Sequence, residues 1–231
     1  MNGGVFENFY ASTWQHPILL WAAALAALAF CATRPGLDAG VRRYCFALVA
    51  LSLIDAWLTT TDVWGIGRLQ GAAVSLVPLF FVLAGDFRYL VLLGAADARG
   101  KLSFDGRVVL AGLGWMLIVP VLSQAILGVL PGDGNNPRIL FLVYEILFFL
   151  LTCGLLARHP GHERAPWLRG VSRFVLLYYG LWATADAIIL ATGSDLGFAV
   201  RVVPNVLYYG GLIAVIGGAA ASASRGTSAA D

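Results

Sequence analysis

Charged residues are scarce in this sequence, and their scarcity excludes a water-soluble globule. Only 12% of the 231 residues are Asp, Glu, Lys or Arg, whereas 59% are hydrophobic. Soluble domains carry about 25% charged and about 45–50% apolar residues. With half the usual charge, the chain has too little polar surface to cover a globule in water. We therefore predict an all-α integral membrane protein that is surrounded by the lipid bilayer.

Other absences exclude further classes of function. The net charge of +2 is too small to indicate a nucleic-acid partner. The three cysteines, Cys31, Cys45 and Cys153, lie in apolar runs without CxxC spacing, which indicates small buried hydrophobes rather than metal ligands or disulfides. The sequence has no cofactor motif, no metal-like cluster in its apolar runs and no nucleophile beside a base. We therefore predict no cofactor, no metal and no catalytic residues.

Long apolar runs dominate the residues that are present. A membrane-spanning helix needs about 20 predominantly apolar residues. Seven runs meet this requirement, at residues 17–33, 44–66, 71–94, 108–130, 139–157, 171–192 and 198–220. The joins between them are short, so we expect a single transmembrane domain over residues 1–220. The tail over residues 221–231, rich in Ala and Ser, is predicted to be disordered and cytoplasmic.

Basic residues are distributed unequally between the two ends of these runs. With the N-terminus outside, the outer loops hold only Arg68, Arg138 and Arg201, and the inner loops and tail hold most of the others. This asymmetry favours an N-out, C-in orientation by the positive-inside rule. That orientation requires an odd number of spans, which agrees with seven. Compactness and heavy use of Ala, Gly and Arg indicate the cytoplasmic (inner) membrane of a bacterium.

Two parts of the chain match each other weakly. Thr60-Thr61-Asp62 matches Thr184-Ala185-Asp186, and Val77-Pro78 matches Val203-Pro204. A parallel repeat of three spans joined by one inverting span would give a 3+1+3 plan, which transporters use. The alternative is chance, because Gly and Pro are common in membrane helices. The plan is similar to that of small seven-span sugar and vitamin transporters, but their Pro-Gln signature is absent, and no family is assigned.

Ionisable residues within the spans form the predicted site. Carboxylates at membrane depth cost free energy and usually mark a functional route. Their positions place Asp62, Glu145 and Asp186 toward the outer third of three different helices. We predict an outward-facing acidic pocket, whose further lining residues are Arg201, Asn205, Trp57, Trp182, Tyr179 and Tyr208. The alternative is a network of ion pairs and hydrogen bonds that only holds helices together.

Two smaller sets of charged residues are predicted to have other functions. Asp55, Asp62 and Asp186 are predicted to relay a proton or an ion, because neighbouring buried acids can hold a proton near neutral pH. Asp86 and Arg88 are predicted to form an inner gate. Their alternative is structural: Arg88 extends to the inner surface, and Asp86 pairs with a neighbouring helix.

Together these features predict a small membrane protein that binds and transports a small polar or cationic solute. Proton coupling is a hypothesis that follows from the acids. Two alternatives stay open: a membrane-embedded enzyme that modifies a lipid, and a sensor or assembly subunit of a membrane complex. A homo-oligomer or another membrane protein is also compatible with the sequence as a partner.

Overall fold

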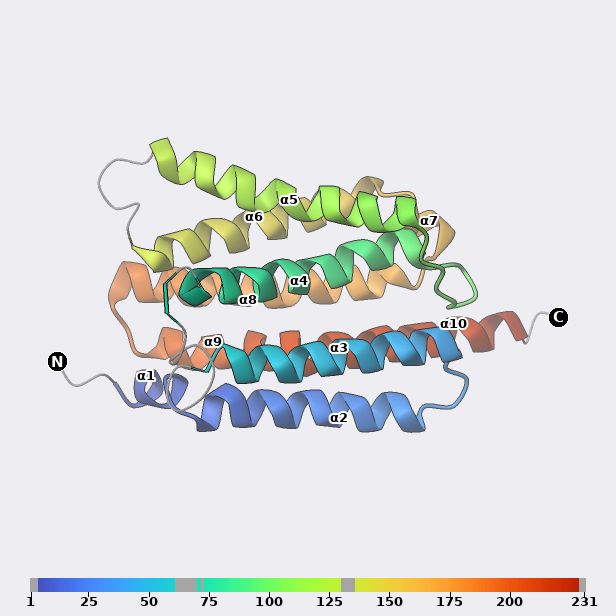
Figure 1. Cartoon of the computed structure of the whole chain (residues 1–231), viewed down its shortest axis with the longest axis horizontal. Coiled ribbons are helices and arrows are strands. Elements are labelled where there is room, and N and C mark those ends of the chain that lie inside the picture. The colour runs from blue at the N-terminus through green and yellow to red at the C-terminus, as the bar shows by residue number, and fades with distance from the viewer. Residues whose placement is uncertain (1–3, 61–69, 72, 130–135, 229–231) are drawn as a thin grey trace.

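The fold is a bundle of long helices that run along one axis. The computed structural model describes residues 4–60, 70–71, 73–129 and 136–228, and over these ranges the chain is all-helical. Figure 1 shows α1 (Val5–Tyr10) at one end of the bundle and α7 (Gly161–Arg164) at the other. We refer to these as the α1 end and the α7 end.

Within the described ranges, six helical stretches are long and apolar enough to cross a membrane. Their elements are η1 (Trp14–Leu19) with α2 (Leu20–Thr33), α4 (Ala73–Ala95), α5 (Gly106–Val129), α6 (Pro137–Arg158), α8 (Leu168–Thr192), and α9 (Leu196–Val206) with η3 (Leu207–Gly211) and α10 (Leu212–Ser228). The chain is therefore a multi-pass membrane protein, as its composition predicts.

The helix α3 (Ala39–Leu58) is the element that leaves the predicted count of seven unconfirmed. It packs along α2 and α10, but it carries Arg42, Arg43 and Asp55 and is not among the six apolar stretches. The predicted span at residues 44–66 also continues into 61–69, which lie outside the described residues. The seven-span count and the 3+1+3 repeat remain predictions.

Local side-chain chemistry explains where several helices begin and end. The carboxylate of Asp38 accepts a hydrogen bond of 2.7 Å from the Gly40 amide and caps α3. The Asn136 side chain caps α6 in the same way, at 3.0 Å from the Arg138 amide. Gly193 ends α8 with a φ of 64°, a left-handed conformation that glycine adopts without a steric penalty.

The C-terminal helix is longer than the sequence indicated. α10 is helical to Ser228, whereas we expected a disordered tail from residue 221. Alanine favours helix strongly, and the Ser224 hydroxyl donates a hydrogen bond of 2.8 Å to the carbonyl of Arg99. That contact ties the last turns of α10 to the connection between α4 and α5. Residues 229–231 lie outside the described residues.

Apolar side chains cover both the inside and the outside of the bundle. Phe148, Tyr178 and Ile213 are completely or almost completely buried in a shared core. Leu110 and Val121 on α5, by contrast, are exposed on the outer surface. In water such an outer surface would be unfavourable, but it suits contact with lipid chains. The helices are thus consistent with a lipid bilayer around them.

A buried histidine lies at the α7 end, between α6 and α8. The Nε2 atom of His162 is 2.8 Å from the hydroxyl oxygen of Ser172, which also accepts a hydrogen bond of 2.9 Å from the Tyr89 hydroxyl. The Nδ1 atom of His162 has no hydrogen-bond partner among the described residues. Burial lowers the pKa of His162 below its ordinary value of 6.5, because the imidazolium loses its hydration.

This lowered pKa predicts a loss of stability in acid. The unfolded chain takes up a proton near pH 6.5, whereas the folded protein takes it up only at lower pH. His162 therefore gives its full contribution to stability above pH 6.5 and loses it as the pH falls. We expect the thermal midpoint of the wild type to decrease more steeply below pH 6.5 than that of His162→Gln. Parallel curves for the two proteins would contradict this prediction.

Candidate functional site

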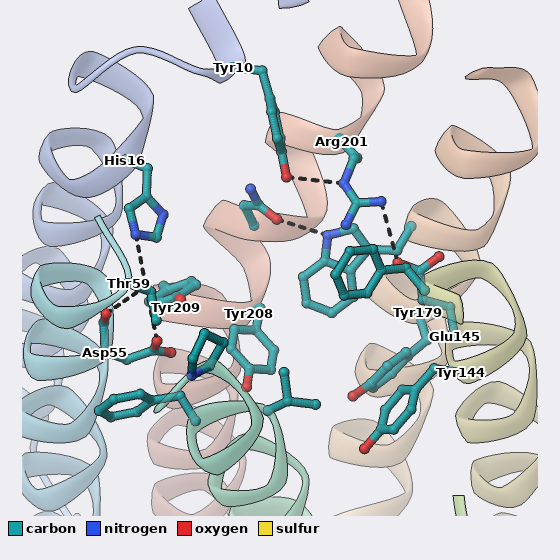
Figure 2. A pocket seen from close by; sticks show the side chains of 16 residues that line it. Tyr10, His16, Asp55, Thr59, Tyr144, Glu145, Tyr179, Arg201, Tyr208 and Tyr209 are labelled. Atoms are coloured by element: carbon teal, nitrogen blue, oxygen red, sulfur yellow. Dashed lines mark hydrogen bonds and ion pairs between the residues drawn. The ribbon is translucent and has the colours of Figure 1, made fainter. Parts of the chain in front are cut away.

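A cavity of about 270 Å³ lies inside the α1 half of the bundle, and Figure 2 shows the side chains that line it. Five long helices, together with α1, η1 and η3, contribute to its wall. The lining residues are Tyr10, His16, Asp55, Thr59, Pro78, Phe81, Val82, Phe141, Tyr144, Glu145, Tyr179, Trp182, Arg201, Asn205, Tyr208 and Tyr209. Aromatic rings make up much of this wall, and the ionisable groups are few. This is the usual composition of a small-molecule site.

Four charged residues form an ion-pair cluster beside the cavity: Arg138, Glu145, Asp186 and Arg201. The Oδ1 atom of Asp186 contacts the Nη1 atoms of both arginines, and the Arg138 contact is 2.8 Å. Arg201 Nη1 also lies 3.6 Å from Glu145 Oε1. Asp186 is fully buried and joins α6, α8 and α9. This part of the site fits the alternative in which buried charges hold helices together.

Glu145 differs from Asp186 because it lines the cavity and has only one ion-pair contact, at 3.6 Å. Asp186 Oδ2 also has no hydrogen-bond partner among the described residues, but Asp186 is not part of the cavity wall. The Glu145 side chain is 7% exposed, and its Oε2 atom has no hydrogen-bond partner among the described residues. A buried carboxylate oxygen without a donor is unfavourable by about 1–3 kcal/mol or more. A ligand that donates a hydrogen bond to Oε2 would remove this cost. Glu145 therefore indicates a binding role, beyond a purely structural one.

Asp55 lies in a second polar group on the wall, contributed by α3 and η1. The Thr59 hydroxyl is 2.7 Å from the Asp55 carbonyl oxygen and 3.4 Å from the Asp55 carboxylate. His16 Nε2 lies 3.0 Å from the same hydroxyl oxygen. Because the single Thr59 proton is directed to Asp55, His16 is the donor in the third contact. Asp55 forms no ion pair with a described Lys or Arg.

Asp86 supports the cavity wall from behind. It is buried near the middle of α4, and its two carboxylate oxygens accept hydrogen bonds from the hydroxyls of Tyr144 and Tyr179. Both tyrosines line the cavity. The carboxylate thus fixes the positions of one ring from α6 and one ring from α8.

Arg88 holds a third tyrosine of the wall. Its guanidinium carbon lies 3.9 Å from the centre of the Tyr208 ring, and its Nη2 atom donates a hydrogen bond of 2.7 Å to the Tyr208 carbonyl. Gly85 makes this arrangement possible, because a Cβ atom there would lie 1.4 Å from the Tyr208 hydroxyl. Asp86 and Arg88, predicted as an inner gate, therefore lie directly behind the cavity wall.

The structure brings most of the predicted binding residues together. Those that line the cavity are Glu145, Arg201, Asn205, Trp182, Tyr179 and Tyr208. Asp186 lies behind them in the ion-pair cluster. Trp57 is elsewhere: its side chain is 46% exposed, in an outer groove between α2 and α3. Asp62, the first acid of the predicted pocket, lies outside the described residues.

The structure places only two of the three predicted relay acids near the cavity. Asp55 lines the cavity and Asp186 lies behind it, and Asp62 lies outside the described residues. Over the described ranges, no hydrogen bond or ion pair joins Asp55 to Asp186. A direct relay between these two acids therefore has no support in their contacts.

Several lining residues were not predicted from the sequence. Phe141 and Tyr144 precede Glu145 by four and one residues, and Tyr209 follows Asn205 by four. Helical spacing around the known candidates could have found Phe141 and Tyr209. Nothing comparable marks His16, whose position depends on the contact with Thr59 of another helix.

Comparison with known proteins gives no relative for this chain. No protein-family model, no curated protein and no solved structure matches it. Function must therefore be inferred from the cavity itself. Over the described residues, no group of three or more His, Cys, Asp or Glu side chains is arranged to hold a metal ion. The described cavity wall offers two carboxylates, one histidine, one arginine and several aromatic rings.

The two acids of the ion-pair cluster should respond differently to neutralisation. Asp186→Asn removes a fully buried carboxylate from two partly buried arginines and should lower the free energy of unfolding by about 3 kcal/mol. Glu145→Gln removes only the longer contact and should have a clearly smaller effect. Thermal unfolding in detergent micelles measures both, with the exposed Glu163→Gln as control. Equal losses for the two variants would contradict the assigned roles.

Proposed function

We propose that this protein binds a small polar or cationic solute in the cavity and moves it across the membrane. The observation that carries the proposal is the unpaired Oε2 atom of Glu145, buried in a cavity among membrane-compatible helices. A carboxylate at this depth is costly, and such residues usually face a substrate or ion route. Asp186 Oδ2 is unpaired as well, but Asp186 already has two arginine partners and does not line the cavity, so Glu145 is the acid of the cluster that a solute would meet.

The charges of the wall favour a cation over an anion. Arg201 is the one arginine among the described lining residues, and it is already committed to Asp186, Glu145 and the hydroxyl of Tyr10. Its positive charge is therefore already offset by two acids and attracts an anionic solute only weakly. The acids Asp55 and Glu145 retain unused capacity, and the surrounding aromatic rings attract positive charge.

The proposal includes a topology that fits the distribution of charges. Seven spans, with α3 as the seventh, would place the N-terminus outside and the C-terminus in the cytoplasm of a bacterium. The cavity would then open toward the outer side. A 3+1+3 repeat would supply the symmetry for alternating access. Proton coupling would be a property of Asp55 and Glu145, because each is a buried acid without full pairing.

A transport assay with matched variants tests the proposal. Purified protein in proteoliposomes should take up small ammonium or polyol solutes, and Glu145→Gln or Trp182→Ala should lower the initial rate by about tenfold or more. Glu163→Gln and Trp14→Ala are the matched controls, because both residues are exposed and lie outside the cavity. These controls should leave the rate unchanged.

Three results would contradict the proposal. Uptake that is insensitive to both cavity variants would separate the activity from the cavity. Turnover of added lipid without any solute flux would instead favour the lipid-modifying enzyme. A membrane protein that co-purifies with the chain, in the absence of flux, would favour the assembly subunit.

A further inference from the structure

The charges around the cavity do not balance over the described residues. The basic residues that line or support it are Arg88, Arg138 and Arg201, and the acidic ones are Asp55, Asp86, Asp186 and Glu145. The four members of the ion-pair cluster neutralise one another. Arg88 lies among carbonyl oxygens and the Tyr208 ring, behind the wall, and its charge acts on both Asp86 and Asp55. One negative charge is left over, and of the two acids that share Arg88 only Asp55 lines the cavity.

Asp55 is well placed to receive a cation. It is 6% exposed, lines the cavity and is hydrogen-bonded to the hydroxyls of Thr59 and Tyr209, without an ion pair to a described Arg or Lys. Figure 2 shows Asp55 and Glu145 on opposite sides of the cavity, with Tyr208 and Tyr209 between them. A molecule that reaches from one acid to the other would therefore pass over aromatic rings.

The wall selects the kind of cation. Hard metal cations need about six or more oxygen ligands, whereas much of this wall consists of aromatic and aliphatic carbon. Aromatic rings beside a carboxylate instead favour an organic ammonium ion, through cation–π attraction. A dication would replace one excess negative charge by one excess positive charge, at a depth where uncompensated charge is costly.

We propose that the cavity binds a monovalent organic ammonium ion, with Asp55 as its counter-ion. In this arrangement, a neutral N–H or O–H group at the other end of the molecule donates a hydrogen bond to Glu145 Oε2. Tyr208 and Tyr209 contact the segment between the two ends. This assignment rests on the proposed function, because it names the substrate class of the same cavity.

Four molecules of one chain length and different charge test the assignment. They are 4-amino-1-butanol, 1,4-butanediol, 4-hydroxybutyrate and 1,4-diaminobutane, with charges of about +1, 0, −1 and +2 at neutral pH. Calorimetry on the full-length protein in nanodiscs gives the affinity of each. We expect 4-amino-1-butanol to bind about tenfold or more tightly than the other three.

Variants of the two acids identify their separate contributions. Asp55→Asn should weaken binding of 4-amino-1-butanol by about tenfold or more and leave that of 1,4-butanediol unchanged. Asp55→Glu should retain most of the affinity, which separates loss of charge from loss of fold. Glu145→Gln should weaken binding of both molecules, because both carry a hydroxyl donor. Size-exclusion profiles and thermal midpoints of all variants check folding.

Several results would overturn the assignment. They are equal or tighter binding of the diol, the hydroxybutyrate or the diamine, unchanged affinity in Asp55→Asn, and no binding of any of the four. Flux measurements distinguish this failure from that of the proposed function. Binding of 4-amino-1-butanol through Asp55 without flux supports the ammonium site and contradicts transport. Flux of 4-hydroxybutyrate that is independent of Asp55 supports transport and contradicts the ammonium site.

Discussion

Charged side chains inside this bundle must be balanced locally, because the bilayer core has no water to solvate them. Asp186 meets this requirement with two arginines and thereby fixes three helices relative to one another. Asp86 meets it with two tyrosine hydroxyls. Glu145 meets it through one contact of 3.6 Å that leaves its second oxygen unpaired, and Asp55 meets it through hydroxyl hydrogen bonds without an ion pair; both face the same cavity. The incomplete balance, more than the hydrophobic core, is what gives this molecule a candidate site.

The wall of the cavity is supported by a second layer of polar contacts. Three of its tyrosines are held by Asp86 or Arg88, and Trp182 donates a hydrogen bond of 2.8 Å to the Asn205 side chain. Rings that are fixed in this way keep their faces toward the cavity without paying ordering entropy when a ligand binds. The same contacts join α4, α6, α8 and η3, so that binding geometry and helix packing depend on one another.

The sequence predicted the membrane class and most helix positions, because apolar run length and composition are local properties. Helical spacing also grouped Arg201, Asn205 and Tyr208 on one face, and the structure places all three around one cavity together with Glu145. The sequence could not place Trp57 or identify the role of His16. Whether Trp57 faces lipid or the interior is decided by its neighbouring helices, and His16 acquires its role only from Thr59. Pairing between helices is a tertiary property without a local signal.

The π-helical turn η3 changes which side of the last transmembrane stretch each following residue faces. A π-type turn contains more residues than an α-helical turn, and each helical residue advances by about 100°. Before η3, the stretch presents Arg201 and Asn205 to the cavity, and after it Ile213 and Ile216 enter the apolar core. Tyr208 and Tyr209, at the wide turn, both reach the cavity wall. The first half of this helix therefore faces the cavity, and its second half faces the apolar core. The wide turn of the backbone sets the rotation between these two faces.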